Sequence, residues 1–393
     1  MFRSLPNMLQ GIPADIWITI FEALDEPSHL AQVVLTCRKF NQLGSKILLR
    51  YVLWTREDPT RRNLVHWQSV HNNFLFLPRR LKIDLSFDGL LFPESMMFHV
   101  SDEILLYRQP RLRALQSTHA TPSPANGLYD TVVQQISKFT MLEELILTRI
   151  PITPVIYQLV ASLPKLRFLE IRCCIFVNQD PLALTPLLET NNASSITHLV
   201  LWENAPSREQ PSPGIATHLL HRLAGSSLRS LTITWCSSSS LLFGTRRWQL
   251  PNLKQLELHV ALLTRDLTDS AVEFVNNCTA NPRVSLYVNK YNVAAPQISS
   301  TNVPMRGLRS FRGPLPVVAV FTGSSSKVEH ITLTESLEIN HLLAGLERLS
   351  QNIRTLDLQL RKYDNEVLFA IHQLFPDVES VAIRFGKGAL PKV

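Results

Sequence analysis

From residue 79 onward, the hydrophobic positions repeat one pattern: an apolar residue, two others, an apolar residue, one other, and a third apolar residue. The clearest copy is Leu142, Leu145 and Leu147. Further copies begin at Leu166, Ile196, Leu228, Leu253, Val328, Ile353 and Val378, weaker ones at Leu112, Leu286 and Leu308, and an opening one at Leu81. The two-residue alternation that ends each copy predicts a short β-strand.

The copies that begin at 112, 142, 166, 196, 228 and 253 recur at intervals of 24 to 32 residues, and those that begin at 328, 353 and 378 are 25 apart. This period is typical of leucine-rich repeats. Helical patterns lie between the strands, over residues 154–163, 216–224, 266–278, 337–349 and 366–375. We therefore expect an α/β fold, a curved solenoid with parallel strands on its concave face and helices on its convex face, because stacked units must cover one another's leucines.

The repeats are expected to fill residues 79–393, with one irregular range. Residues 289–327 contain Pro314, Pro316 and a serine run, which indicates a loop insertion over a degenerate repeat. Residues 1–54 show no repeat and form a separate helical module, and residues 55–78 are the linker between the two.

The helical module is expected to contain three short helices. Ile16, Ile20 and Leu24 recur every four positions on the first, after Pro13 in a first-turn position. Residues 29–43 form the second helix, and the apolar segment 44–54 forms the third. So short a module buries little apolar surface on its own, so we expect exposed apolar side chains on which a partner can dock.

The segment from Ile12 to Trp54 resembles an F-box, a motif with a Leu-Pro pair, an acidic residue, aliphatics, a Cys-Arg pair and a closing aromatic. The matching residues are Ile12, Pro13, Asp15, Ile16, Ile20, Leu24, Leu30, Val34, Cys37, Arg38, Phe40 and Trp54. They occupy a small part of the 393-residue chain, and Ile12 replaces the family's leucine with similar apolar volume. With the repeats behind it, this layout resembles fungal-type F-box/leucine-rich-repeat proteins.

That resemblance implies a non-catalytic, substrate-recognition subunit of a Skp–cullin–F-box ubiquitin ligase. The F-box would bind a Skp-type adaptor and, through it, a cullin–RING ligase, while the repeats would hold a protein substrate. The residues that would contact the adaptor are Ile12, Pro13, Ile16, Ile20, Leu30 and Val34. For Val34 and Cys37 we favour packing inside the module over contact with the adaptor, and we expect Cys37 to be a buried small apolar group rather than a reactive thiol.

The substrate surface is expected on the concave face. The leucines of each strand point into the solenoid, so the residues between them point to the concave face. Aromatic and arginine side chains carry much of the energy at protein interfaces, so we single out positions on the strands of the copies that begin at Leu166 and Ile196, together with two on the strand of the copy that begins at Leu253. The candidate residues are Phe168, Arg172, His198, Trp202, Glu257 and His259.

No motif for catalysis, a cofactor or a metal is evident in the sequence. It has no glycine-rich phosphate loop and no nucleophile elbow. Cys173 and Cys174 lack a second cysteine pair, and His218 and His221 lack an acidic or cysteine neighbour in sequence, so neither pair predicts a metal site. The formal net charge is +7, but the basic residues are scattered doublets, which does not favour a nucleic-acid surface.

The cytoplasm, the nucleus or both are the expected location. No apolar stretch is long enough to span a membrane, and Pro6, Pro13 and Asp15 interrupt the apolar segment that a secretory signal requires. Five scattered cysteines fit a reducing compartment.

Other interpretations of the same sequence remain open. The chain could be a leucine-rich-repeat scaffold outside any ligase, or an enzyme with a scattered active site. Its helices could instead cap the solenoid, with Ile16, Ile20 and Leu30 packed on Leu81 and Ile83. A steep salt dependence of binding would support a role for nucleic acid.

Overall fold

The computed structural model describes fourteen ranges of the chain: 12–24, 27–69, 75–85, 125–176, 195–202, 205–206, 227–236, 239–240, 250–278, 280–291, 305–321, 327–349, 352–362 and 366–385. The chain divides into two compact units. Unit 1 comprises Met1–Leu90, His119–Ile150 and Val155–Leu169, and unit 2 comprises Leu91–Thr118, Pro151–Pro154 and Glu170–Val393.

Unit 1 begins with three helices, α1 (Ala14–Glu22), α2 (Pro27–Val34) and α3 (Arg38–Leu48). We call these helices the N-terminal module. Its core contains Phe21, Leu30, Val34 and Ile47, and half-buried apolar residues such as Trp17 and Phe40 pack against it. The ring centroids of Trp17 and Phe40 are 4.5 Å apart, and those of Phe21 and Phe40 are 5.3 Å apart.

The second and third helices differ from the sequence prediction in their bounds. The helix expected over residues 29–43 ends at Val34, because Cys37 adopts an extended conformation (φ −155°, ψ 162°) before α3 begins at Arg38. Helix α3 and α2 approach closely at Gly44, where a Cβ atom would lie only 3.3 Å from Val34 Cγ1. Glycine therefore permits this helix contact, at the usual cost of glycine inside a helix.

The parallel sheet of unit 1 starts before the expected first repeat. Strand β1 (Tyr51–Trp54) pairs with β2 (Arg80–Asp84), and β2 pairs with β3 (Glu144–Thr148). Residues 51–54 were expected to be helical, but Val52 and Trp54 alternate with more exposed neighbours and extend the apolar ladder of the sheet. Helix α4 (Glu57–Ser69) lies within the expected linker, and α8 (Ala125–Ile136) and α9 (Pro154–Ser162) complete the described helices of the unit.

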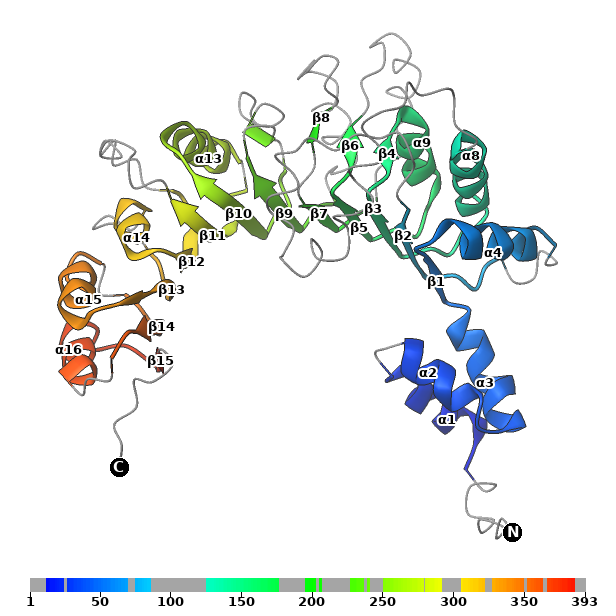
Figure 1. The fold of residues 1–393 in the computed structure, drawn as a ribbon, viewed down its shortest axis with the longest axis horizontal. Coiled ribbons are helices and arrows are strands. Elements are labelled where there is room, and N and C mark those ends of the chain that lie inside the picture. Colours follow the sequence, from blue (N-terminus) through cyan, green and yellow to red (C-terminus); the bar gives the residue numbers. More distant parts are fainter. Residues whose placement is uncertain are drawn as a thin grey trace, which may run out of the picture. The chain divides into compact units, whose positions relative to one another are not determined.

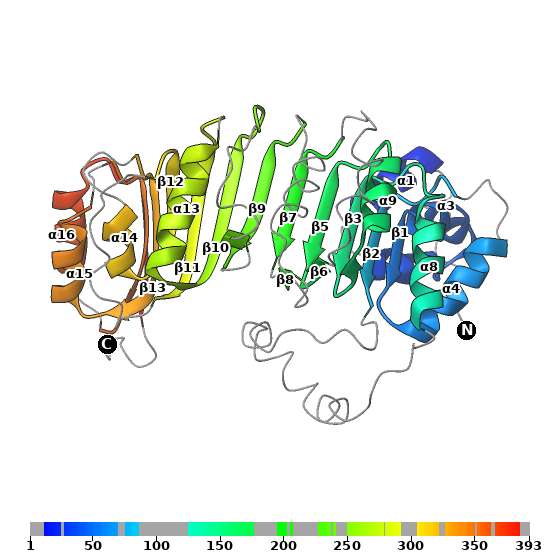
Figure 2. The same ribbon diagram turned by 90° about the horizontal axis from the view of Figure 1, so that it is seen from above.

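Strand β5 (Phe168–Arg172) falls at the unit boundary, and unit 2 continues with a sheet of parallel strands in chain order. These strands are β7 (His198–Trp202), β9 (Ser230–Trp235), β10 (Gln255–Leu263), β11 (Arg283–Tyr291), β12 (Leu308–Gly313), β13 (His330–Leu337), β14 (Thr355–Leu360) and β15 (Ser380–Phe385). Figure 2 shows the strands from β7 to β12 side by side. The expected leucine ladder is confirmed: Leu199 is in register with Leu231, and Leu231 with Leu256.

The described helices of unit 2 lie on one side of its sheet (Figure 1). They are α13 (Arg265–Asn277), α14 (Leu315–Phe321), α15 (Ile339–Leu346) and α16 (Glu366–Leu374). Helices α13, α15 and α16 confirm three predicted helices, and the Thr264 hydroxyl caps α13 by accepting the Leu267 N–H. Short strands β4 (Pro151–Ile152), β6 (Ile175–Phe176) and β8 (Ala205–Pro206) form a second parallel sheet. We call the face opposite the helices the helix-free face.

A recurring backbone hydrogen-bond pattern holds neighbouring repeats in register. The carbonyl oxygen just before one strand accepts two consecutive N–H groups at the start of the next strand. Thr197 O accepts from Arg229 N at 2.8 Å and from Ser230 N at 3.0 Å. Glu329 O accepts in the same way from the N–H groups of residues 354 and 355. Because each link satisfies strand-edge groups, successive leucines stay aligned along the sheet.

Residues 289–327 contain more regular structure than the sequence suggested. Strand β11 runs to Tyr291, and β12 followed by α14 forms a strand–helix pair. Pro314 directly precedes α14 and Pro316 lies in its first turn, where a missing N–H has no intrahelical partner to lose. Residues 292–304 and 322–326, the copy at Leu112 and the helix expected over 216–224 lie outside the described residues.

Candidate interaction surfaces

The N-terminal module exposes apolar side chains of α1. Ile16 is 48% exposed and Ile20 is 44% exposed, and the two lie one helical turn apart. Pro13, which precedes the helix, is also exposed, and Ile12 is half-buried. These four residues form an apolar strip that the core of the module leaves uncovered, and we call it the α1 strip.

The other two proposed adaptor contacts are buried. Leu30 is 1% exposed and Val34 is 4% exposed, and both belong to the core that joins the three helices. Leu30 corrects the sequence expectation, because a side chain that packs α2 against α3 has no surface left for a partner, whereas the burial of Val34 confirms the internal packing that the sequence favoured for it. Leu30 and Val34 can therefore support the α1 strip only by holding the helices together.

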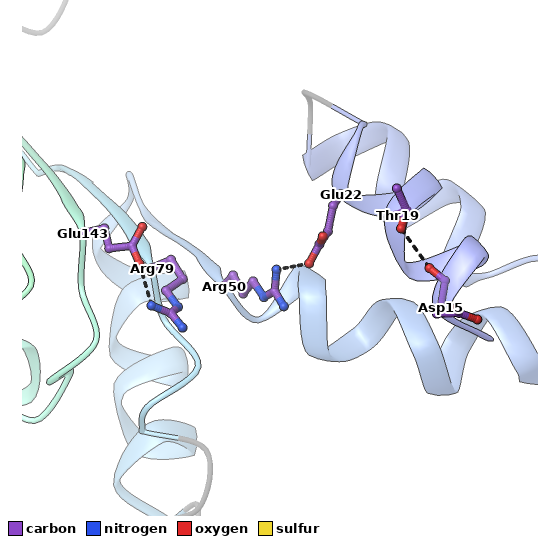
Figure 3. A network of polar contacts seen from close by, with 6 residues as sticks. All are labelled: Asp15, Thr19, Glu22, Arg50, Arg79 and Glu143. Carbon is purple, nitrogen blue, oxygen red and sulfur yellow. Dashed lines mark hydrogen bonds and ion pairs between the residues drawn. The ribbon is translucent and has the colours of Figure 1, made fainter. Parts of the chain in front are cut away.

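One polar contact lies within α1, and another joins α1 to the chain after α3 (Figure 3). The Thr19 hydroxyl donates to the Asp15 carbonyl oxygen at 3.0 Å. Arg50 pairs with Glu22 at 2.5 Å, and both side chains are well exposed, so this pair adds at most about 1 kcal/mol. The exposure of Ile16 and Ile20 contradicts the interpretation in which they are packed on Leu81 and Ile83 as a cap.

One of the cysteines, Cys37, lies in a different environment from the one that we expected. Cys37 is exposed rather than buried, because the extended residue between α2 and α3 turns its side chain away from the core. Cys174 and Cys278 are buried, and burial raises the pKa of the Cys278 thiol to about 12. Of the free cysteines, Cys37 is therefore the exposed one.

A row of aromatic side chains crosses the helix-free face of unit 2. Trp235 packs on Phe274 of α13, with ring centroids 4.9 Å apart, so the preceding Thr234 points to the helix-free face. Trp202 and His259 lie on strands that β9 separates, yet their ring centroids are only 4.5 Å apart. Thr234 of β9 is in register with His259, and the two rings cover it, so that it is only 9% exposed.

The row continues across the next strand pair and ends at a cation on each side. His259 and Tyr287 are neighbours in register and their rings are parallel within 2°, with centroids 4.3 Å apart. The Arg172 guanidinium lies 5.9 Å from the Trp202 ring centroid, and Arg312 is in register with Tyr287. We name the following set the Arg–aromatic row: Arg172, Trp202, Thr234, His259, Tyr287 and Arg312.

Carboxylates border the Arg–aromatic row two residues earlier on two of its strands. Glu170 is 8% exposed, and its Oε1 lies 2.5 Å from Arg172 Nη2. Glu257 lies 3.7 Å from His259 Nε2 and accepts the Thr232 hydroxyl at 3.4 Å. Burial lowers the pKa of His259 despite the nearby Glu257 carboxylate, and Arg312 acts in the same direction as burial. The lowered pKa favours the neutral form of the imidazole at neutral pH.

The structure brings together four of the six expected substrate residues. Arg172, Trp202, Glu257 and His259 gather at the Arg–aromatic row. His198 is exposed, with its Nδ1 2.9 Å from Thr197 Oγ1 and outside the row. Phe168 is half-buried and belongs to unit 1.

Sequence reasoning missed Tyr287 and Arg312. Tyr287 stands between Leu286 and Val288, and this alternation was the available signal for a side chain on the helix-free face. Arg312 follows Phe311 in the same way, but it fell in the range taken for an insertion. The register of β11 with β10 and β12 is what places both residues on the row.

The described residues show neither a metal-binding cluster nor a membrane-spanning helix. Within those ranges, no group of three or more histidine, cysteine or acidic residues is placed to hold a metal ion. No helix in the described part of the chain has the length and apolarity needed to cross a membrane. His218 and His221 lie outside the described residues.

The geometry defines a leucine-rich-repeat type of fold: parallel strands in register, buried leucines and helices on one side. No protein-family model matches the sequence, and no similar curated protein was found. An internalin from Listeria monocytogenes str. 4b F2365 is 14% identical over 64% of this chain and 78% of its own, with a TM-score of 0.29. The TLR13–ssRNA13 complex is 12% identical over 65% of this chain, with a TM-score of 0.23. Our chain covers 45% of that chain.

Proposed function

We propose that this protein is the substrate-recognition subunit of a Skp–cullin–F-box ubiquitin ligase. In this proposal the N-terminal module binds a Skp-type adaptor through the α1 strip, and the repeats bind a protein substrate on the helix-free face. The chain itself catalyses no reaction and needs no cofactor. The single observation that carries the proposal is an intact three-helix core beside exposed Ile16 and Ile20.

The physical reason is the cost of leaving the α1 strip in water. Each of these isoleucines is about half exposed. Burying the exposed half against an apolar partner surface is favourable, because it removes apolar area from water. Phe21 lies on the same helix but is 1% exposed, so α1 serves two purposes: one face packs the module and the other stays available.

A leucine-rich-repeat scaffold outside any ligase is the second candidate. The Arg–aromatic row supports it equally well, because that surface needs no adaptor. The two candidates differ in one respect: a ligase subunit must join an adaptor and a cullin at once, whereas a scaffold need not.

Co-expression with a Skp-type adaptor and a cullin, followed by co-purification, tests the proposal. We expect both proteins to purify with the wild-type chain and to be lost with Ile16→Asp, because an apolar contact would have to desolvate the carboxylate. Val155→Asp is the matched control, since Val155 is 46% exposed on α9, nearly the same as Ile16. A folded wild-type chain that retains neither protein would reject the ligase proposal, and retention of the adaptor without a cullin would favour the scaffold.

A further inference from the structure

The charges on the helix-free face of unit 2 are not balanced position by position. Glu170 pairs with Arg172, and Asp357 accepts from Arg384 at 2.7 Å. The Glu257 carboxylate accepts a hydrogen bond from the Thr232 hydroxyl and lies beside His259. Glu170 and Asp357 therefore each have an arginine partner, and Glu257 has a hydroxyl and an imidazole beside it.

Two arginines on the same face are not paired in this way. Arg312 on β12 is exposed and forms no ion pair with any described residue. Arg283 begins β11, is in register with Gln255, and is likewise exposed and without an ion pair in the described ranges. A carboxylate from another molecule could pair with either guanidinium without displacing an existing partner.

The surroundings of Arg312 also suit an acceptor-rich ligand. Its register neighbours are Tyr287 on one side and Thr332 on the other, and both carry hydroxyl donors. The Glu170 carboxylate pairs with Arg172, and the Glu257 carboxylate lies beside His259, so neither forms an ion pair with Arg312. A cationic ligand would meet an arginine at each end of the row, which makes it the less favourable occupant.

We propose that the Arg–aromatic row binds an extended, acidic segment of a partner protein, with one carboxylate on Arg312. This proposal names the substrate class of the repeat surface and rests on the substrate role proposed above. The half-buried rings of Trp202, His259 and Tyr287 supply apolar contact between the two arginines. A second carboxylate of the segment would reach Arg172, whose guanidinium has donors beyond the one that faces Glu170.

The spacing of the strands sets the length of the segment. Arg172 and Arg312 lie on the first and last of the strands β5, β7, β9, β10, β11 and β12. Five intervals of about 4.8 Å span about 24 Å, which about seven extended residues at about 3.3 Å each would cross. The expected segment therefore carries acidic residues about seven positions apart, with apolar or small residues between them.

Selection from a displayed library of random nine-residue peptides on the full chain tests this surface without the adaptor. We expect the wild-type chain to enrich peptides with acidic residues near both ends. Selection on Arg312→Glu should lose the acidic preference at one end and gain lysine or arginine there. The peptide selected most strongly on wild type, fluorescently labelled, should bind Arg312→Glu about tenfold or more weakly and should weaken with added salt.

The matched control is Arg306→Glu. Arg306 is an exposed arginine in the turn just before β12, so the variant makes the same charge change in the same repeat but outside the row. It should bind the selected peptide as wild type does. Trp202→Ala should weaken the same peptide through lost ring contact.

Three results would overturn the proposal: no enriched peptide, enrichment of neutral or basic peptides, or equal binding by wild type and Arg312→Glu. Adaptor co-purification is measured on the same variants and should not change with Arg312→Glu. A chain that binds acidic peptides but no adaptor would therefore reject the ligase role alone, and a chain that binds the adaptor but no acidic peptide would reject this surface alone.

Discussion

Alanine at Leu30 and alanine at Ile16 should differ strongly in their effect on the N-terminal module. Leu30 is 1% exposed, and its Cδ1 lies 3.5 Å from where a Cβ on Gly44 would stand, so α2 and α3 meet there. Leu30→Ala should lower the free energy of unfolding of the module by about 2–5 kcal/mol, because the tight helix contact cannot collapse into the cavity.

The corresponding loss at Ile16 is much smaller. Ile16→Ala removes three carbon atoms that are worth about 0.8 kcal/mol each when fully buried, and the side chain is 48% exposed. About half of that sum remains, and the better helix propensity of alanine offsets part of it. We expect a net loss of about 1 kcal/mol or less.

Hydrogen exchange of the full chain, read out on peptides that cover residues 14–48, measures both variants. At tenfold per 1.4 kcal/mol, amides of the module should exchange at least about 30-fold faster in Leu30→Ala and about fivefold faster or less in Ile16→Ala. Equal acceleration in the two variants would refute the division into a core and an exposed strip. So would a Leu30→Ala variant that exchanges like wild type.

Three further predictions concern other parts of the chain. Gly307→Ala should destabilise unit 2 by about 1–3 kcal/mol in a denaturant titration, because φ is +72° and a Cβ would lie 2.2 Å from the Pro282 carbonyl oxygen; an unchanged midpoint would contradict this. A maleimide at neutral pH should label Cys37 quickly and Cys278 only on unfolding, as read by mass spectrometry. Equal labelling rates for the two cysteines would contradict the burial of Cys278. Because the pKa of His259 is lowered on folding, the unfolded chain binds its proton at higher pH, so stability should fall as the pH drops below about 6.5. His259→Gln should weaken this dependence of stability on pH, measured by denaturant titrations at several pH values. The same pH dependence in wild type and His259→Gln would contradict the role given to His259.

The repeat architecture could be predicted from the sequence because its cause is local and periodic. Each strand carries its own alternation, and the leucines that stack in register, such as Leu256 between neighbouring strands, recur at a fixed place in every copy. Helices α13 and α16 were predictable for the same reason, because each has its own apolar stripe.

Strand β1 was not predictable in this way. Val52 and Trp54 lie in a short apolar segment that a helix would suit equally well, and pairing with β2 decides between the two. Which of the proposed adaptor contacts are exposed and which are buried also depends on tertiary contacts. Ile20 and Leu30 are both aliphatic residues on amphipathic helices, but only the packing of α2 on α3 buries Leu30.

The candidate substrate surface was likewise predictable only in part, because part of it depends on contacts between strands. Trp202 and His259 were predictable as side chains on one face, because each alternates with buried leucines. Their contact across Thr234 depends on the order of the strands, and the contribution of Arg312 depends on a strand in a proline-containing range. Sequence alternation predicts which way a side chain points, whereas neighbours across strands come from the register.

Calorimetric titration of the full chain with a purified Skp-type adaptor tests the proposed ligase role most directly. We expect a one-to-one complex, an affinity at least about tenfold weaker for Ile16→Asp, and an unchanged affinity for Val155→Asp. Absence of binding by the folded wild-type chain, or equal affinities for wild type and Ile16→Asp, would contradict it.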